Sequence, residues 1–186
     1  MGVGEVGRLR RAVFLDRDGV INRTIPRKGG YGPPWSVEQL ELAPDAPAAV
    51  SSLARAGFVL VVVTNQPDIA RLDLDRGTLN EINAAIRRAL PELAGFLVCM
   101  HDDRDNCFCR KPKPGMLQAA ALRYGLDLAE SYMVGDRYKD VEAGQNAGCR
   151  TVWIREIAHA ERAPQRPADC EVQTLGEAAG WILGRG

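Results

Sequence analysis

The chain has 186 residues, which is the size of one ordinary domain. Lysine and arginine together number 24, and so do aspartate and glutamate, so no net charge would attract nucleic acid or an anionic membrane. Hydrophobic residues make up 46% of the chain, too many for a disordered protein. We therefore expect one folded domain over 1–186, with 1–10 as a mobile N-terminus.

Short apolar runs alternate along the chain with segments that have helical spacing. The runs that suit buried strands are 12–15, 58–63, 96–100, 132–134 and 151–154. The segments that suit helices are 45–56, 75–90, 116–124, 139–147 and 175–183. This alternation predicts the α/β class, with a doubly wound parallel sheet covered by helices on both faces. The interval 155–173 has two prolines and no clear periodicity, which predicts a surface excursion.

Hydropathy gives no sign of a membrane segment. No apolar run approaches the roughly 20 residues of a membrane helix, and the N-terminal segment lacks the hydrophobic stretch of a secretion signal. We therefore expect a cytoplasmic protein with no membrane partner and no nucleic-acid partner. A monomer is expected from the modest size.

Polar residues follow the predicted strands at the point where each strand ends. Asp16 and Asp18 follow the first strand, Thr64 and Asn65 follow the second, and Asp136 follows the fourth. Ligands of open parallel sheets bind beyond the carboxyl ends of the strands. These side chains are therefore predicted to converge on one site.

The spacing of Asp16 and Asp18 indicates phosphate chemistry. Two carboxylates in one pocket repel each other, unless a cation is bound or one of them is protonated. One can then act as a nucleophile toward phosphorus, and the other can donate a proton to the leaving oxygen. Because a phosphate dianion repels a carboxylate, a divalent cation and a fixed positive side chain are also needed. Asp136 can bind the divalent cation, and the basic run 110–113 can supply the positive side chain.

Three of the five cysteines lie close together in the sequence beside a histidine. Cys99, His101, Cys107 and Cys109 offer three sulfurs and one imidazole, a closed tetrahedral set that is typical of structural zinc. The alternative is a loop with free thiols. A zinc-braced loop would fix the direction of the basic run that follows it, and small misplacements there are costly in rate.

Four sequence motifs, in this order, resemble those of the haloacid dehalogenase (HAD) superfamily of phosphatases. They are DRDGV at 16–20, TNQ at 64–66, RKPKPG at 110–115 and GDRYKD at 135–140. Within that superfamily the chain is most similar to the heptose bisphosphate phosphatases, with the histidinol-phosphate phosphatases second. The resemblance covers about 11–154 and implies a HAD-like Rossmannoid fold with no separate cap domain.

The resemblance also implies an activity and residue roles. The protein would be a magnesium-dependent phosphomonoesterase with Asp16 as the nucleophile that becomes an aspartyl-phosphate. Asp18 would act as acid and then base, and Thr64 and Lys111 would hold the phosphoryl group. Mg²⁺ would be bound by Asp16, by the main-chain carbonyl of Asp18 and by Asp136. The expected substrate contacts are Asn22, Arg23, Tyr31, Asn65, Gln66 and Arg110.

The implied substrate is a small phosphorylated sugar, a heptose 1,7-bisphosphate that loses its 7-phosphate. Histidinol phosphate or another small sugar phosphate is an alternative, and a non-catalytic sugar-phosphate-binding module is an alternative of another class. The chain departs from the heptose phosphatases at two places near the phosphate site. It has Pro67, Asp68 and Leu72 where they commonly have Ser, Gly and Gly, and its 23–38 segment is longer and includes Trp35.

Overall fold

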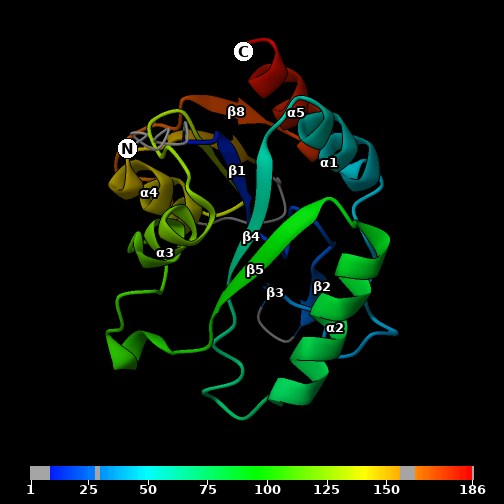
Figure 1. Ribbon diagram of the computed structural model, residues 1–186. Helices are drawn as coiled ribbons and strands as arrows, with labels where there is room; N and C mark the ends of the chain where they lie inside the picture. The colour runs from blue at the N-terminus through cyan, green and yellow to red at the C-terminus, as the bar shows by residue number, and fades with distance from the viewer. Residues whose placement is uncertain (1–8, 28–29, 156–161, 186) are drawn as a thin grey trace, which may run out of the picture.

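The computed structural model describes residues 9–27, 30–155 and 162–185 (Figure 1). A six-stranded parallel sheet, in the order β5, β4, β1, β6, β7, β8, forms its centre. The strands are β1 Ala12–Leu15, β4 Val59–Asn65, β5 Leu93–Cys99, β6 Tyr132–Gly135, β7 Arg150–Ile154 and β8 Cys170–Val172. This sheet confirms the predicted α/β class.

Helices cover both faces of the sheet (Figure 1). Their bounds are α1 Ala46–Arg55, α2 Arg76–Ala89, α3 Gly115–Tyr124, α4 Tyr138–Ala147 and α5 Leu175–Leu183, with a short 3-10 turn η1 at Asp103–Asp105. Apolar residues of α1, α2 and α5 pack in one core cluster, and those of α3 and α4 pack in another. The helices agree with the predicted segments to within one residue at each end.

Alternation of side chains along the central strand separates these two clusters. Val13 and Leu15 of β1 belong to the cluster under α1, α2 and α5, whereas Ala12 and Phe14 belong to the cluster under α3 and α4. All four are fully buried, because successive strand residues point to opposite faces and helices cover both. The sheet is thus rigid where β1 ends and the functional residues begin.

The prediction that 155–173 is only a surface excursion is wrong at its end. Cys170–Val172 forms β8, which pairs in parallel with β7 at the edge of the sheet. The Asp169 carboxylate just before it accepts from the Thr151 backbone N–H at 2.7 Å. A three-residue edge strand has too few alternating positions to give a sequence signal. Residues 156–161 lie outside the described part of the chain.

The predicted mobile N-terminus falls mostly on 1–8, which lie outside the described residues. Arg10 is anchored: it forms an isolated parallel bridge with Leu126, and its guanidinium donates to the Tyr124 carbonyl at 2.7 Å. In the described part of the chain, no helix has the length and apolar character needed to span a membrane.

A small antiparallel hairpin follows β1. It consists of β2 Ile25–Arg27 and β3 Gly30–Gly32. Residues of this hairpin and of the segment after it share a cavity with the residues at the carboxyl ends of β1 and β4. The hairpin therefore forms part of the wall of this cavity.

Candidate active site

The cavity at the carboxyl edge of the sheet has a volume of about 280 Å³. The predicted catalytic residues line it together: Asp16 and Asp18 after β1, Thr64 at the end of β4, and Lys111 in the loop before α3. These residues are far apart in the sequence, and the parallel register of β1 and β4 brings their carboxyl ends to one edge. The convergence predicted from strand-end residues is thus present.

A buried lysine lies at the centre of this cavity. The Lys111 ammonium donates to Asp16 Oδ1 at 2.7 Å and to the Val63 carbonyl at 2.8 Å, and it is 2.6 Å from Asp140 Oδ1. Burial alone would lower the pKa of Lys111, but the charges of Asp140 and Asp16 raise it above its ordinary value. Lys111 is therefore a fixed positive charge beside Asp16.

Asp16 lies at the end of β1, where its main-chain N–H donates to the Val134 carbonyl of β6. Burial raises the pKa of Asp16 to about 6, and the charge of Lys111 opposes that rise. The Asp16 side chain is 9% exposed. A desolvated carboxylate held by one cation is suited to nucleophilic attack, because little water must leave it first.

Asp136 has the features of a metal ligand. Both of its carboxylate oxygens are buried, and they have no hydrogen-bond partner among the described residues. Burial and the charges of Asp16 and Asp140 raise its pKa well above the ordinary value. Carboxylate oxygens of Asp16, Asp136 and Asp140 all lie within 4.8 Å of one another. Unpartnered oxygens in such a cluster fit a hard divalent cation such as Mg²⁺.

A glycine permits this close approach of Asp136 to the loop after β1. Gly19 has a φ of +87°, and a Cβ at that position would lie 2.3 Å from Asp136 Oδ2. Any side chain would therefore push Asp136 away, and the positive φ would strain it as well. The Gly of the DRDGV motif is explained by this contact.

Asp18 is held by three neighbours. Arg17, which is fully buried, donates from Nε and Nη2 to both Asp18 oxygens at 3.0 to 3.2 Å. Gln66 donates to Asp18 at 2.7 Å, and Asn22 donates at 3.0 Å. Asn83 of α2 accepts from Arg17 at 3.1 Å and so orients the guanidinium. The Asp18 carboxylate therefore has a fixed direction while it still borders the cavity.

Two predicted substrate contacts lie behind Asp18. Asn22 and Gln66 are fully buried, and neither lines the cavity around Asp16. The Gln66 amide also donates to the Thr64 hydroxyl at 2.8 Å, so it joins Thr64 to Asp18. The amide NH2 group of each side chain donates inside the protein, whereas the buried amide oxygens have no hydrogen-bond partner among the described residues. Their placement differs from the prediction because both side chains donate to Asp18, Gln66 from just after β4 and Asn22 from the loop after β1.

Asn65 holds the loop that carries Lys111. Its side chain donates to the Lys111 carbonyl and accepts from the Lys111 N–H, both at 3.1 Å. Tyr31 and Arg110 line the same cavity, as predicted for substrate contacts. Arg23 lines a neighbouring hollow and forms an exposed ion pair with Glu41 at 3.2 Å.

The four predicted zinc ligands form one cluster. The sulfur atoms of Cys99, Cys107 and Cys109 lie 3.4 to 3.6 Å apart, and His101 Nδ1 lies 3.6 Å from Cys99 and 3.3 Å from Cys109. Bonds of about 2.3 Å from zinc to sulfur would place tetrahedral sulfurs about 3.8 Å apart. Burial raises the pKa of Cys99 to about 12, which a bound cation would reverse. The donor set and its spacing fit Zn²⁺.

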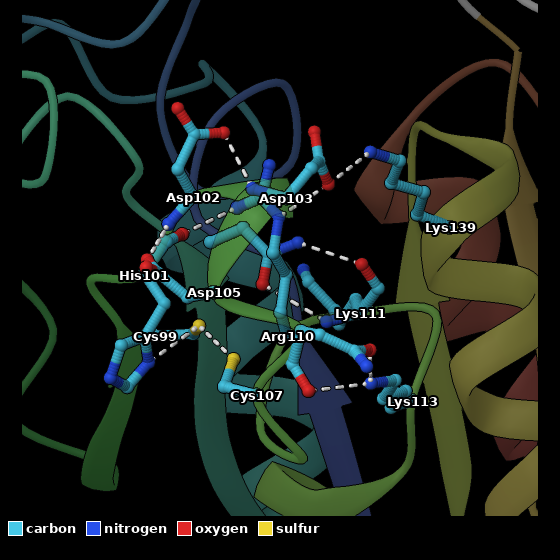
Figure 2. Close-up of polar contacts among 12 residues, drawn as sticks. Cys99, His101, Asp102, Asp103, Asp105, Cys107, Arg110, Lys111, Lys113 and Lys139 are labelled. Atoms are coloured by element: carbon cyan, nitrogen blue, oxygen red, sulfur yellow. Dashed lines mark hydrogen bonds and ion pairs between the residues drawn. The ribbon is translucent and has the colours of Figure 1, made fainter.

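The loop with this cluster, residues 99–109 and called the Cys/His loop below, contacts Arg110 directly (Figure 2). Arg110 Nε donates to Asp103 at 2.7 Å, and its Nη1 donates to the His101 carbonyl at 3.1 Å. Lys139 also reaches Asp103, at 3.5 Å (Figure 2). The loop thus carries the acceptors that aim Arg110 at the cavity.

Three features of the site are not evident from local sequence. Asp140 belongs to the fourth motif, but only the fold shows its contact with Lys111. Nothing in the local sequence indicates that the Arg17 side chain pairs with Asp18. Nothing there indicates that Asn83 accepts a hydrogen bond from Arg17. Asp140 lies in the first turn of α4, whereas Asp136 precedes the helix, and an acidic residue in the first turn of a helix is the one signal that could have drawn attention to Asp140.

Comparisons with known proteins identify the family. Residues 108–178 match a protein-family model described as HAD-hyrolase-like. The D-glycero-beta-D-manno-heptose-1,7-bisphosphate 7-phosphatase of Bordetella bronchiseptica is 36% identical over 156 residues, which cover 82% of this chain and 84% of that protein. The enzyme of the same name from Escherichia coli K12 is 35% identical over 89% of this chain and 90% of its own length. The chain belongs to the heptose bisphosphate phosphatase family.

A solved structure of the heptose bisphosphate phosphatase family has the same fold. The crystal structure of D,D-heptose 1,7-bisphosphate phosphatase from B. bronchiseptica, complexed with magnesium and phosphate, superposes with a TM-score of 0.82. It is 30% identical, and the match covers 95% of this chain and 99% of that one. The resemblance inferred from the four motifs is confirmed.

Proposed function

We propose that this protein is a Mg²⁺-dependent phosphomonoesterase that removes the 7-phosphate of D-glycero-D-manno-heptose 1,7-bisphosphate. The observation that carries the proposal is the contact of Lys111 with Asp16 beside the unpartnered oxygens of Asp136. A nucleophile, a fixed cation and a place for a divalent metal are the parts that phosphoryl transfer needs. The sugar is proposed from the names of the relatives.

In the proposed reaction, a carboxylate oxygen of Asp16 forms a bond to phosphorus while the bond from phosphorus to the sugar oxygen at C7 breaks. Asp18 gives its proton to that oxygen, and the sugar leaves as an alcohol. Asp18 then takes a proton from water, which attacks phosphorus and releases orthophosphate and free Asp16. Lys111 and Thr64 hold the phosphoryl oxygens through both steps.

Mg²⁺ would be bound by Asp16 and Asp136 and by the main-chain carbonyl of Asp18. When bound, it neutralises the charge that would otherwise keep the phosphate away from Asp16. The buried oxygens of Asp136, which have no hydrogen-bond partner in the part of the chain that the structure describes, support this assignment. Asp140 is engaged by Lys111 at 2.6 Å and by the Arg137 N–H at 2.9 Å, so we assign it to positioning Lys111.

A structural zinc is part of the proposal. The set of Cys99, His101, Cys107 and Cys109 would be closed by one Zn²⁺, with no open position for chemistry. Its effect on catalysis would be indirect, through the hydrogen bonds from Arg110 to Asp103 and to the His101 carbonyl. A monomeric state stays a prediction.

The proposal is tested by phosphate release from both anomers of the heptose bisphosphate and from histidinol phosphate, each with Mg²⁺. We expect the heptose bisphosphate to have the largest kcat/KM, and Asp16→Asn to abolish turnover while the far-UV spectrum stays unchanged. Faster hydrolysis of histidinol phosphate would favour the alternative substrate. Sugar-phosphate binding without turnover by the wild type would favour the non-catalytic module.

A further inference from the structure

A second cation faces the cavity from the hairpin side. The Arg27 guanidinium lies over the Trp35 ring, 3.5 Å from its centroid, and its Nη2 donates to the Pro33 carbonyl at 2.5 Å. Gly32 is also close to it, because a Cβ at that position would lie 3.0 Å from Arg27 Nε. Stacking on an aromatic face orients a guanidinium and leaves its edge for anions. Arg27 is therefore a positioned side chain, and it lines the cavity that contains Asp16.

Trp35 is itself anchored across the cavity rim. Its indole N–H donates to Asp68 Oδ2 at 2.8 Å. Asp68 is 3.9 Å from the Arg71 guanidinium, which donates to Asp102 of the Cys/His loop at 2.8 Å. A line of contacts thus runs from the hairpin through the segment after β4 to the loop that carries the zinc ligands. Trp35 and Asp68 lie in the two segments, 23–38 and 67–72, at which the sequence departs from the family pattern that it resembles.

Arg27 differs from the neighbouring cations of the cavity in its ion pairing. Around the cavity, Lys111 is paired with Asp16, Arg110 with Asp103, and Arg71 with Asp102. Within the described ranges, no ion pair joins Arg27 to a carboxylate, and its buried Nε has no hydrogen-bond acceptor. An oriented cation without an anion in a substrate cavity is suited to an anionic group of the ligand.

We propose that Arg27 determines specificity by binding the phosphate that stays on the sugar. This inference rests on the proposed function, in which the substrate has two phosphates and only one reaches Asp16. The second phosphate is a dianion, and a guanidinium can donate two parallel hydrogen bonds to it. Trp35 and Asp68 are positioning residues, because the stack and the indole hydrogen bond fix where Arg27 points.

The test compares two substrates that differ in one phosphate: the heptose 1,7-bisphosphate and the heptose 7-phosphate. Arg27→Gln, which removes the charge and its hydrogen bonds to the phosphate, should raise KM for the bisphosphate about tenfold or more and leave kcat within about twofold. KM for the 7-phosphate should not change. Arg88→Gln, which removes an exposed arginine of α2, is the matched control and should leave KM unchanged for both substrates.

Product inhibition gives an independent readout. Heptose 1-phosphate retains the phosphate assigned to Arg27, so its inhibition constant should rise about tenfold in Arg27→Gln. Trp35→Phe keeps an aromatic face but loses the hydrogen bond to Asp68, and it should have a smaller effect in the same direction. Trp35→Ala should have an effect as large as that of Arg27→Gln.

The outcomes separate this inference from the proposed function. Suppose that the wild type hydrolyses the bisphosphate efficiently, but that Arg27→Gln changes neither the KM for the bisphosphate nor the inhibition constant of the 1-phosphate. The role of Arg27 is then refuted, and the proposed function stands. An equal rise in KM for both substrates also refutes it, because Arg27 would then act on the transferred phosphate. A wild type that fails to hydrolyse the bisphosphate overturns both.

Discussion

Lys111 Nζ lies 2.7 Å from Asp16 and 2.6 Å from Asp140, so one ammonium joins the carboxylate after β1 to a carboxylate of α4. All three side chains are buried. One cation between two carboxylates leaves a net negative site, which a divalent cation must complete before a phosphate can enter. The position of Lys111 therefore depends on Asp140 as much as on its own loop.

Removal of the Asp140 charge should slow the reaction without unfolding the protein. Asp140→Asn keeps an oxygen that can accept from the Arg137 N–H at the start of α4, but it releases Lys111 from one partner. We expect kcat to fall by about 10²-fold, because small misplacements of a catalytic cation are costly. Steady-state kinetics and a thermal melt measure the two effects. Asp73→Asn, at an exposed site, is the control, and an unchanged kcat in Asp140→Asn would contradict the positioning role.

Asp136→Asn should stabilise the metal-free protein and abolish its response to Mg²⁺. The two buried oxygens of Asp136 have no partner among the described residues, and Asp16 and Asp140 repel its charge. Loss of that charge should raise the free energy of unfolding by about 1 to 3 kcal/mol. Thermal melts with and without Mg²⁺ test this. A stabilising Mg²⁺ shift that persists in the variant would show that the metal binds elsewhere.

Zinc removal should lower activity through Arg110. Cys109→Ser should abolish zinc binding and reduce kcat/KM by about 10-fold to 100-fold, because Arg110 loses the ordered Asp103 and His101 carbonyl. Elemental analysis and kinetics measure the two quantities. Cys170→Ser, outside the cluster, should retain one zinc per chain. Asp103→Asn should retain the zinc and still lower kcat/KM; full activity in that variant would contradict the link through Arg110.

Leu72→Gly should stabilise the protein. Leu72 has a φ of +64° and a side chain that is 90% exposed, so it strains the backbone with little packing in return. Relief of left-handed strain should exceed the entropic cost of glycine and raise the unfolding free energy by about 1 kcal/mol. Chemical denaturation measures the change. Leu72→Ala keeps the Cβ and should leave stability unchanged, and equal effects of both variants would show that the strain is absent.

The candidate site residues could be predicted because their signals are local. Asp16, Asp18, Thr64 and Asp136 each follow an apolar run at the end of a strand, and parallel strands bring their carboxyl ends to one edge. The Cys/His cluster could be predicted because its four members lie within eleven positions, 99–109. Such patterns need no knowledge of how distant segments pack.

The directions of side chains were not identifiable in this way. Asn22 and Gln66 were expected at the substrate, but they are buried behind Asp18. Arg17 pairs with the residue next to it, an arrangement that depends on Asn83 of α2. The contacts of Gln66 with Asp18 and of Arg17 with Asn83 join segments that are 48 and 66 positions apart, and a local pattern cannot specify them.

The amino-acid sequence by itself determined the class of fold, the positions of the candidate carboxylates after the strands and the spacing of the Cys/His set, because alternation, strand ends and close spacing are properties of short segments. Only the tertiary structure decided that Lys111 bridges Asp16 and Asp140, and that Trp35 holds Arg27 and reaches Asp68. Those contacts join residues that lie 95, 29, 8 and 33 positions apart, and most of them exist only after the sheet, its helices and the hairpin have packed.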